Sequence, residues 1–496
     1  MKKKFTRVLV SALMLSTMAG TLFAANPKRE MRSTWFTTVE NIDWPTKRGT
    51  SASVQATQKQ EMLTFLDKME EMKLTSTCLQ VRSMGDAMYP SQYAPWSYYL
   101  TGTRGVDPGW DPLAYFVEEA HKRGIEAYVW LNPYRWSSGT QWSTDMDKAW
   151  KDADMLITGD NGTYVTYNPA LPETRQMIVN VVKEILNNYA IDGVIFDDFF
   201  YPSGGTTEGS SAPDYSHYKA SGTTMSMGDW RRRNVNDMVA DVYNAIKELK
   251  PDVRFGISPA GVSKNGASRY GISTSLISKA SDWQYAQIYS DPLAWLEEGT
   301  VDFVSPQLYW ITTHSTNGFG PLSQWWSDVA ATYFDRHFYA SHSVSFLASA
   351  DTQANWTEMG KQINYSRQYT KNNAPGSIYF STKNVYGPGA KGLGTYLIND
   401  QYSTPALVPV TEWKSGSVYG KVADLKYENG TLTWTPTVNG NAIIRYTVYA
   451  MPMNVTIDNA KAADGDGFDV KYLQKVVYAN SFVLTTEVQA NYWYLV

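Results

Sequence analysis

The fold of this chain is decided by the stretch Ile191-Asp192-Gly193-Val194-Ile195-Phe196-Asp197-Asp198-Phe199-Phe200-Tyr201-Pro202. An apolar run of strand length ends there in two adjacent carboxylates, which are followed by aromatics and a proline. A continuous apolar strand of this kind is typical of a parallel sheet that is covered on both faces. Acids at the carboxyl end of such a strand stand where α/β sheets and (β/α)8 barrels place their chemistry. The stretch therefore predicts a buried strand that delivers Asp197 and Asp198 to a functional site.

Strand-like runs with helical segments between them repeat on both sides of this stretch. Helix signals include Asp111-Pro112, a capping residue followed by proline, and the stop at Gly124. Further helices are expected at about residues 61–74, from Pro172, and at 226–249. Besides the quoted stretch, the expected strands are residues 31–38, 75–82, 126–131, 254–258, 301–308, 338–341 and 377–381. Eight such units predict a (β/α)8 barrel over residues 26–404, and a doubly wound open sheet is the alternative.

The texture of the sequence changes from about Pro405. Helical spacing disappears, and Asn429-Gly430 and Asn439-Gly440 are hairpin turn signals between short strand-like runs. Residues 405–496 are therefore expected to form a small all-β sandwich similar to fibronectin type III domains. Its expected role is that of a spacer or packing partner rather than a sugar-binding module.

The N-terminus and the overall charge indicate where the protein works. Lys2-Lys3-Lys4 and the apolar run that ends at Phe23 predict a signal peptide, residues 1–25, cleaved after Ala24 or Ala25. The apolar run is short for a membrane anchor, and no cysteine follows it to carry a lipid. The net charge of -4 without long charged runs argues against nucleic-acid and membrane-surface partners. We therefore expect a periplasmic or secreted protein with no membrane span after cleavage; the oligomeric state is left open.

The carboxylates suggest acid–base chemistry on sugars, whose apolar ring faces stack on aromatic side chains. The chain has 18 Trp and 34 Tyr. Hydrolysis of a glycosidic bond needs one carboxylic acid to protonate the leaving oxygen and a second carboxylate as nucleophile or base. Asp197 shares a strand face with Ile195 and is the expected carboxylate of the barrel mouth, with Asp198 on the other face unless the strand has already ended. The candidates for its partner are Asp198, Asp43 and Asp86, and Glu40 is a more distant one.

Polar and aromatic side chains recur at the same end of successive strand–helix units. Together they predict an aromatic-rimmed cleft for a neutral, hydroxyl-rich ligand. The chain has none of the sequence patterns of zinc, nucleotide or dinucleotide sites, so no cofactor or metal is predicted. The single cysteine, Cys78, is expected in the core. The candidate substrate-binding residues are Arg82, Asn132, Tyr134, Arg135, Gln307, Tyr309 and Trp310.

Several motifs, taken together, resemble the glycosyl-hydrolase-like family ten, which includes divisome-associated glycoside hydrolases that act on peptidoglycan strands stripped of peptides. They span about residues 28–385 and combine Arg29-Glu30-Met31-Arg32, Asn41-Ile42-Asp43-Trp44-Pro45, Arg82 with Asp86-Ala87-Met88-Tyr89, Pro95-Trp96, Asp111-Pro112-Leu113, Trp130-Leu131-Asn132-Pro133-Tyr134-Arg135, Asn168-Pro169, Asp192 to Pro202, Trp230-Arg231-Arg232 with Asn234, Ile257-Ser258-Pro259 and Ser305-Pro306-Gln307-Leu308-Tyr309-Trp310.

The resemblance implies a (β/α)8 barrel with a glycosidase-type cleft. It leads us to expect a glycoside hydrolase that cleaves a bacterial polysaccharide, above all the peptide-free glycan strand of peptidoglycan. Two alternatives stay open, since a fold constrains function only loosely: a non-catalytic carbohydrate-binding protein on a barrel scaffold, and a hydrolase of dietary or host glycans.

Overall fold

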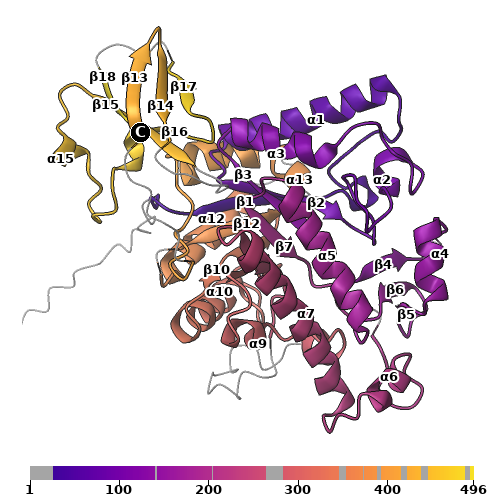
Figure 1. Ribbon diagram of the computed structural model, residues 1–496. Coiled ribbons are helices and arrows are strands. Elements are labelled where there is room, and N and C mark those ends of the chain that lie inside the picture. Colours follow the sequence, from indigo (N-terminus) through magenta and orange to yellow (C-terminus); the bar gives the residue numbers. More distant parts are fainter. Residues whose placement is uncertain are drawn as a thin grey trace, which may run out of the picture.

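The strands of the large domain close into a barrel (Figure 1). In the computed structural model they pair in parallel in the order β10-β9-β8-β7-β3-β2-β1-β12-β11. The strands β10 and β11 are two pieces of one stretch, interrupted only at Tyr339, and they pair with opposite ends of this order. The bounds are β1 (Met31–Phe36), β2 (Ser76–Arg82), β3 (Glu126–Leu131), β7 (Gly193–Phe196), β8 (Arg254–Ile257), β9 (Phe303–Val304), β10 (His337–Phe338), β11 (Ala340–Ser343) and β12 (Gly376–Phe380). The eight-stranded parallel barrel is thus confirmed.

The structure describes residues 26–139, 142–203, 205–263, 283–345, 353–372, 374–387, 392–414, 422–436, 445–485 and 492–496. The predicted signal peptide, residues 1–25, lies outside these ranges, as does Asn439-Gly440. Across the described residues, we find no helix that combines the length and the apolar character needed to span a bilayer.

Helices cover the outside of the barrel, and their ends follow the sequence signals. The Asp111 carboxylate accepts a hydrogen bond from Ala114 N at 3.0 Å, and Ser226 Oγ accepts one from Asp229 N at 3.1 Å. These side chains satisfy N–H groups that a first helical turn leaves free. The main helices are α1 (Ala52–Glu71), α3 (Pro112–Lys122), α5 (Pro172–Asn188), α7 (Met227–Leu249), α9 (Pro292–Glu297), α10 (Phe319–Ser327), α12 (Gln353–Tyr369) and α13 (Thr382–Tyr386).

Shorter elements decorate the barrel at the carboxyl ends of β2, β3, β7 and β8. A small antiparallel sheet with the order β4-β6-β5 follows β3. The bounds of these elements are α2 (Tyr98–Thr101), β4 (Arg135–Ser138), α4 (Asp145–Asp152), β5 (Leu156–Thr158), β6 (Tyr164–Tyr167), α6 (Tyr215–Ala220) and α8 (Trp283–Ala286).

The side chains of the barrel strands point alternately to the two faces of the sheet, so the buried residues form two clusters. One cluster fills the barrel interior and includes Trp35, Cys78, Tyr128, Trp130 and Ile195. A much larger cluster lies between the strands and the surrounding helices. Burial of both strand faces explains the continuous apolar runs of the sequence. Because Ile195 points inward, the period of two also directs Asp197 toward the barrel axis.

Two three-stranded antiparallel sheets form the C-terminal part, with the orders β13-β14-β17 and β16-β15-β18. Asn429 and Gly430 join β13 to β14 with φ angles of 50° and 79°, the left-handed pair that a tight hairpin turn requires. The hairpin is confirmed, whereas likeness to fibronectin type III domains stays a prediction. The bounds are β13 (Ala423–Glu428), β14 (Thr431–Thr435), β15 (Tyr446–Pro452), α15 (Ile457–Ala460), β16 (Leu473–Val477), β17 (Ser481–Val483) and β18 (Tyr492–Leu495).

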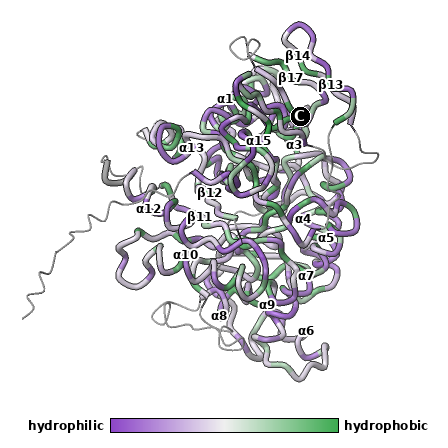
Figure 2. The backbone as a smooth tube through the Cα atoms, turned by 90° about the vertical axis from the view of Figure 1, so that its left-hand side faces the viewer, coloured by the Kyte–Doolittle hydropathy of each residue, from purple (hydrophilic) through white to green (hydrophobic). Residues whose placement is uncertain are grey.

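The C-terminal sheets pack against the amino ends of the barrel strands. Tyr478 Oη donates to Asp192 Oδ1 at 2.9 Å just before β7, and its ring stacks on that of His121 at 3.7 Å. Asp302, just before β9, accepts a hydrogen bond from Trp413 Nε1 at 2.8 Å. In both views the C-terminal strands and α6 lie at opposite ends of the molecule (Figures 1 and 2). The carboxyl ends of the barrel strands therefore remain free of the C-terminal part.

Candidate active site

A cavity of about 360 Å³ opens at the carboxyl ends of the barrel strands. Its walls come from the ends of β1, β2, β3 and β12 and from the segments that follow β1, β3, β7, β8 and β9. This is the end of the barrel at which loops from successive units converge. The lining residues are Trp35, Thr37, Val39, Glu40, Ile42, Gln80, Trp130, Arg135, Asp197, Asp198, Phe199, Ser258, Trp283, Gln307, Tyr309 and Phe380.

Asp197 and Asp198 both line this cavity because β7 has already ended at Phe196. Asp197 keeps the inward direction of Ile195, whereas Asp198 is no longer directed to the opposite face. Asp198 N donates to Asp197 Oδ1 at 2.8 Å, so the backbone turns over the first carboxylate. Gln307 Nε2, from the segment after β9, approaches the same oxygen at 3.5 Å. Two carboxyl groups therefore stand together at the cavity wall.

Burial changes the acidity of this pair. Burial raises the pKa of Asp197 above its ordinary value, against the opposing effects of the hydrogen bonds from Asp198 and the charge of Arg135. Burial and the neighbouring Asp197 charge raise the pKa of Asp198 well above its ordinary value. Like charges at close range cannot both ionise cheaply, so the pair holds a proton to higher pH than a free carboxyl group. A carboxylic acid kept protonated in this way can act as a general acid.

Further polar groups at the cavity wall are buried and, within the described residues, have no hydrogen-bond partner. They include Gln80 Nε2, Arg135 Nε and Ser258 Oγ. Buried polar groups are normally hydrogen-bonded, so such atoms at the edge of a cavity are candidates for ligand contacts. The Arg135 guanidinium is held over the Phe199 ring at 4.6 Å, which leaves its position well defined.

Aromatic rings supply the rest of the wall, and buried polar groups orient two of them. Trp35 Nε1 donates to Ser341 Oγ at 2.9 Å, and Trp130 Nε1 donates to Asn132 Oδ1 at 3.0 Å. The two indoles meet edge to face with ring centroids 4.8 Å apart. Tyr309 and Phe380 stack at 6.1 Å elsewhere on the wall. The combination of fixed rings, carboxyl groups and free donors suits a hydroxyl-rich ligand.

The predicted site residues separate into two groups. Five of them line the cavity: Asp197, Asp198, Arg135, Gln307 and Tyr309. The other six lie elsewhere.

The carboxylates of Asp43 and Asp86 accept hydrogen bonds that hold loops in place. Asp43 Oδ2 accepts from Thr37 N at 2.8 Å, and Asp43 Oδ1 accepts from Ser381 Oγ at 2.8 Å and Lys383 N at 2.9 Å. Asp86 Oδ1 accepts from the backbone N–H groups of the two residues after β2, each at 2.8 Å. Neither carboxylate lines the cavity, so neither is placed to act on a ligand there.

The remaining four residues are packed behind the site. Arg82 is 1% exposed, with its guanidinium 5.5 Å from the centroid of the Tyr167 ring. Asn132 is fully buried, and its Oδ1 accepts the hydrogen bond from Trp130 Nε1. Tyr134 is fully buried in the outer core, and Trp310 packs beside His314 with ring centroids 6.3 Å apart.

Several lining residues did not stand out in the sequence. Trp35, Gln80 and Trp130 are inward-facing residues near the ends of β1, β2 and β3, and strand register alone would have pointed to them. Phe380 ends β12, and Phe199 comes three residues after the end of β7. Trp283 comes from α8 and carries no sequence signal of its own.

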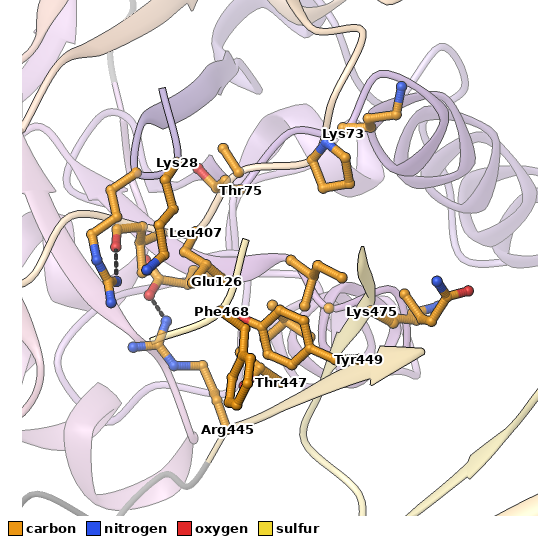
Figure 3. A pocket seen from close by; sticks show the side chains of 18 of the residues that line it. Lys28, Lys73, Thr75, Glu126, Leu407, Arg445, Thr447, Tyr449, Phe468 and Lys475 are labelled. Atoms are coloured by element: carbon orange, nitrogen blue, oxygen red, sulfur yellow. Dashed lines mark hydrogen bonds and ion pairs between the residues drawn. The ribbon is translucent and has the colours of Figure 1, made fainter. Parts of the chain in front are cut away.

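A second cavity, of about 540 Å³, lies between the opposite end of the barrel and the C-terminal sheets. Its charged residues are mostly paired with one another. Arg445 reaches Glu126 from the C-terminal part, as Figure 3 shows, and Lys475 forms an ion pair with Glu70 at 2.6 Å. These pairs join the two parts of the chain. The smaller cavity, with its unpaired donors and raised carboxyl pKa values, is the stronger candidate for chemistry.

Comparison with known proteins identifies the family of this chain. Residues 30–358 match the family model described as Glycosyl hydrolase-like 10. The chain belongs to this family. It is 37% identical over 425 residues to "Glycosyl hydrolase YngK" of Bacillus subtilis, covering 83% of this chain and 80% of that protein. It is 31% identical over 385 residues to "Glycosyl hydrolase DigH" of Escherichia coli K12, covering 74% of this chain and 86% of that protein.

Among solved structures, the glycoside hydrolase domain of PgaB (BpsB) from Bordetella bronchiseptica aligns with a TM-score of 0.48 and 12% identity, covering 74% of this chain and 99% of that one. An α-L-fucosidase isoenzyme 2 from Paenibacillus thiaminolyticus aligns with a TM-score of 0.46 and 14% identity, covering 82% and 55%.

Proposed function

We propose that this protein hydrolyses glycosidic bonds in a bacterial polysaccharide, and that its substrate is the peptide-free glycan strand of peptidoglycan. The observation that carries the proposal is the buried Asp197–Asp198 pair, which lines an open cavity at the carboxyl ends of the barrel strands. Membership of a glycosyl hydrolase-like family supports the reaction class. The choice of glycan strand rests on the family resemblance seen in the sequence motifs.

In the proposed reaction, the Asp197–Asp198 pair supplies the proton. Breaking a glycosidic bond leaves an alkoxide oxygen that must be protonated, and a carboxyl group with a raised pKa is suited to that task. Gln307 fixes one carboxylate oxygen, while Arg135, Gln80 and Ser258 offer hydrogen bonds to sugar hydroxyls. Trp35 and Trp130 provide faces and edges on which a pyranose can pack.

The signal peptide predicted at residues 1–25 supports a periplasmic or extracellular location for this activity, where such glycans occur. A dietary or host glycan is the alternative substrate, and the polysaccharide panel described below distinguishes it from the glycan strand.

The test is incubation of the native protein and the Asp197→Asn variant with peptide-free glycan strands, intact peptidoglycan and a polysaccharide panel. Soluble saccharides are separated and counted. We expect release from the glycan strands by the native protein and a loss of roughly 10²–10⁴-fold in the variant, the range typical of a removed general acid. Equal release by both proteins would remove Asp197 from the mechanism. Tight glycan binding by both proteins without any release would favour the carbohydrate-binding alternative.

A further inference from the structure

The loop after β1 brings one more carboxylate to the cavity. Glu40 lines the same cavity as Asp197 and Asp198 and lies in the short 3₁₀ turn η1 (Val39–Asn41). In the barrel order, β1 is separated from β7 by β2 and β3 on one side and by β12, β11/β10, β9 and β8 on the other. The Glu40 loop therefore approaches the mouth from a different side than the acid pair does.

The backbone at Glu40 has an unusual conformation. Its φ and ψ are 53° and 17°, and φ of the next residue, Asn41, is 52°. A residue with a Cβ rarely adopts this left-handed region, and two in succession are rarer still. Such conformations persist only where the surrounding structure over-determines them, and they concentrate at functional sites.

Hydrogen bonds of the residues on both sides of Glu40 hold its backbone in this conformation. Gln80 Oε1 accepts hydrogen bonds from Thr38 N at 3.0 Å and Val39 N at 2.8 Å, which fixes the residues before it. Asn41 Nδ2 donates to Tyr99 O at 2.8 Å, which fixes the residue after it. The Asp43 carboxylate then ties the loop to the end of β12. All of these bonds hold the loop, and none uses the Glu40 side chain.

The Glu40 carboxylate itself has no structural role that would explain its presence. Within the described residues it takes part in no hydrogen bond or ion pair, and the residue is exposed. Asp43 and Asp86, the other acids at neighbouring strand ends, each accept several hydrogen bonds from their own loops. A carboxylate without a hydrogen bond or ion pair of its own therefore stands on a rigid loop at the cavity wall.

We infer that Glu40 is the second catalytic carboxylate of the site, acting on the face of the sugar opposite the Asp197–Asp198 pair; this inference rests on the proposed hydrolytic function. Glu40 takes a proton from a water molecule, and the water oxygen forms a new bond to the anomeric carbon. The bond from that carbon to the leaving oxygen breaks, and the leaving oxygen takes a proton from the acid pair. The protons then return through solvent, and the product has inverted anomeric configuration.

Three variants test this assignment on peptide-free glycan strands: Glu40→Gln, Glu40→Gly and, as a control, the exposed Glu173→Gln on α5. We expect Glu40→Gln to lower kcat by roughly 10²–10⁴-fold with little change in KM, and Glu173→Gln to leave kcat unchanged. Glu40→Gly should be equally slow yet melt at a higher temperature, because glycine adopts positive φ freely. The higher Tm shows that the lost activity is not lost folding.

Rescue of the reaction rate by azide distinguishes a catalytic role of Glu40 from a structural one. The anion fits the space left in Glu40→Gly and attacks the anomeric carbon, so we expect azide to raise its rate and to give a glycosyl azide of inverted configuration. Wild-type kcat in Glu40→Gln, absence of azide rescue, or retained configuration in the native product would each overturn the assignment. If the native protein itself releases nothing from any glycan, the proposed function fails instead, and the two failures are thereby distinguished.

Discussion

Replacement of Asp43 by alanine tests how the site is built. Asp43 stands at a strand end in the sequence, where a catalytic acid is expected, but its carboxylate joins the β1 loop to the segment after β12. The substitution leaves the N–H groups of Thr37 and Lys383 and the Ser381 hydroxyl without their acceptor. Each buried group left unsatisfied costs about 1–3 kcal/mol.

The buried Thr37 N–H and Ser381 hydroxyl alone would then cost roughly 2–6 kcal/mol. Burial raises the pKa of Asp43, which means that the ionised carboxylate is itself poorly solvated, and removing it offsets part of the loss. We therefore expect the free energy of unfolding to fall by about 2–4 kcal/mol. The Asp43→Asn variant, which keeps one carbonyl oxygen, should lose less.

Urea unfolding followed by tryptophan fluorescence measures this change, with the slope of the transition checked for constancy. Hydrolytic activity is measured alongside, per mole of folded protein at low temperature. Unchanged stability together with a kcat loss of about 10²-fold or more would refute this reasoning and return Asp43 to the list of catalytic acids.

Three further outcomes follow from the described contacts. Asp198→Asn should raise the Tm at neutral pH. Burial and the Asp197 charge raise the pKa of Asp198. The contribution of Asp198 to stability is therefore full below the ordinary Asp pKa of about 4 and is lost as the pH rises through the raised pKa. A Tm gain that did not shrink toward pH 3–4 would contradict this cause. Gln80→Leu should lower both the Tm and kcat, because Thr38 N and Val39 N lose their acceptor. Thermal melts and activity assays measure the two, and a loss of only one of them would contradict this role of Gln80. Tyr478→Phe should cost about 1–3 kcal/mol in urea unfolding with kcat unchanged, because only the bond to Asp192 is lost; an altered kcat would mean that the C-terminal part reaches the site.

The barrel could be predicted because its signals are local. Apolar strands alternate with amphipathic helices, and Asp111-Pro112 and Asn429-Gly430 mark element ends through their own backbone chemistry. The expected strand at residues 301–308 shortened to β9 because Pro306 lacks the N–H that a ladder needs, although Gln307 still bridges to Ala260 and Ser341.

The site could be predicted only in part, because a position at a strand end does not say where a side chain points. Asp197 follows from the strand period, since Ile195 faces inward. Asp86 occupies an equivalent place in the sequence but turns back to cap the N–H groups of its own loop. Glu40 becomes prominent only once its left-handed backbone and the bonds of its neighbours are known. These are tertiary properties that residue spacing does not contain.

In the proposed reaction, the cavity at the acid pair adds water across a glycosidic bond. Mass spectrometry of the saccharides released from peptide-free glycan strands tests it most directly. Hydrolysis predicts that every new reducing end has gained one water molecule, and that the Asp197→Asn protein yields almost none of these products. Products lighter by one water, or equal amounts of product from both proteins, would contradict the account.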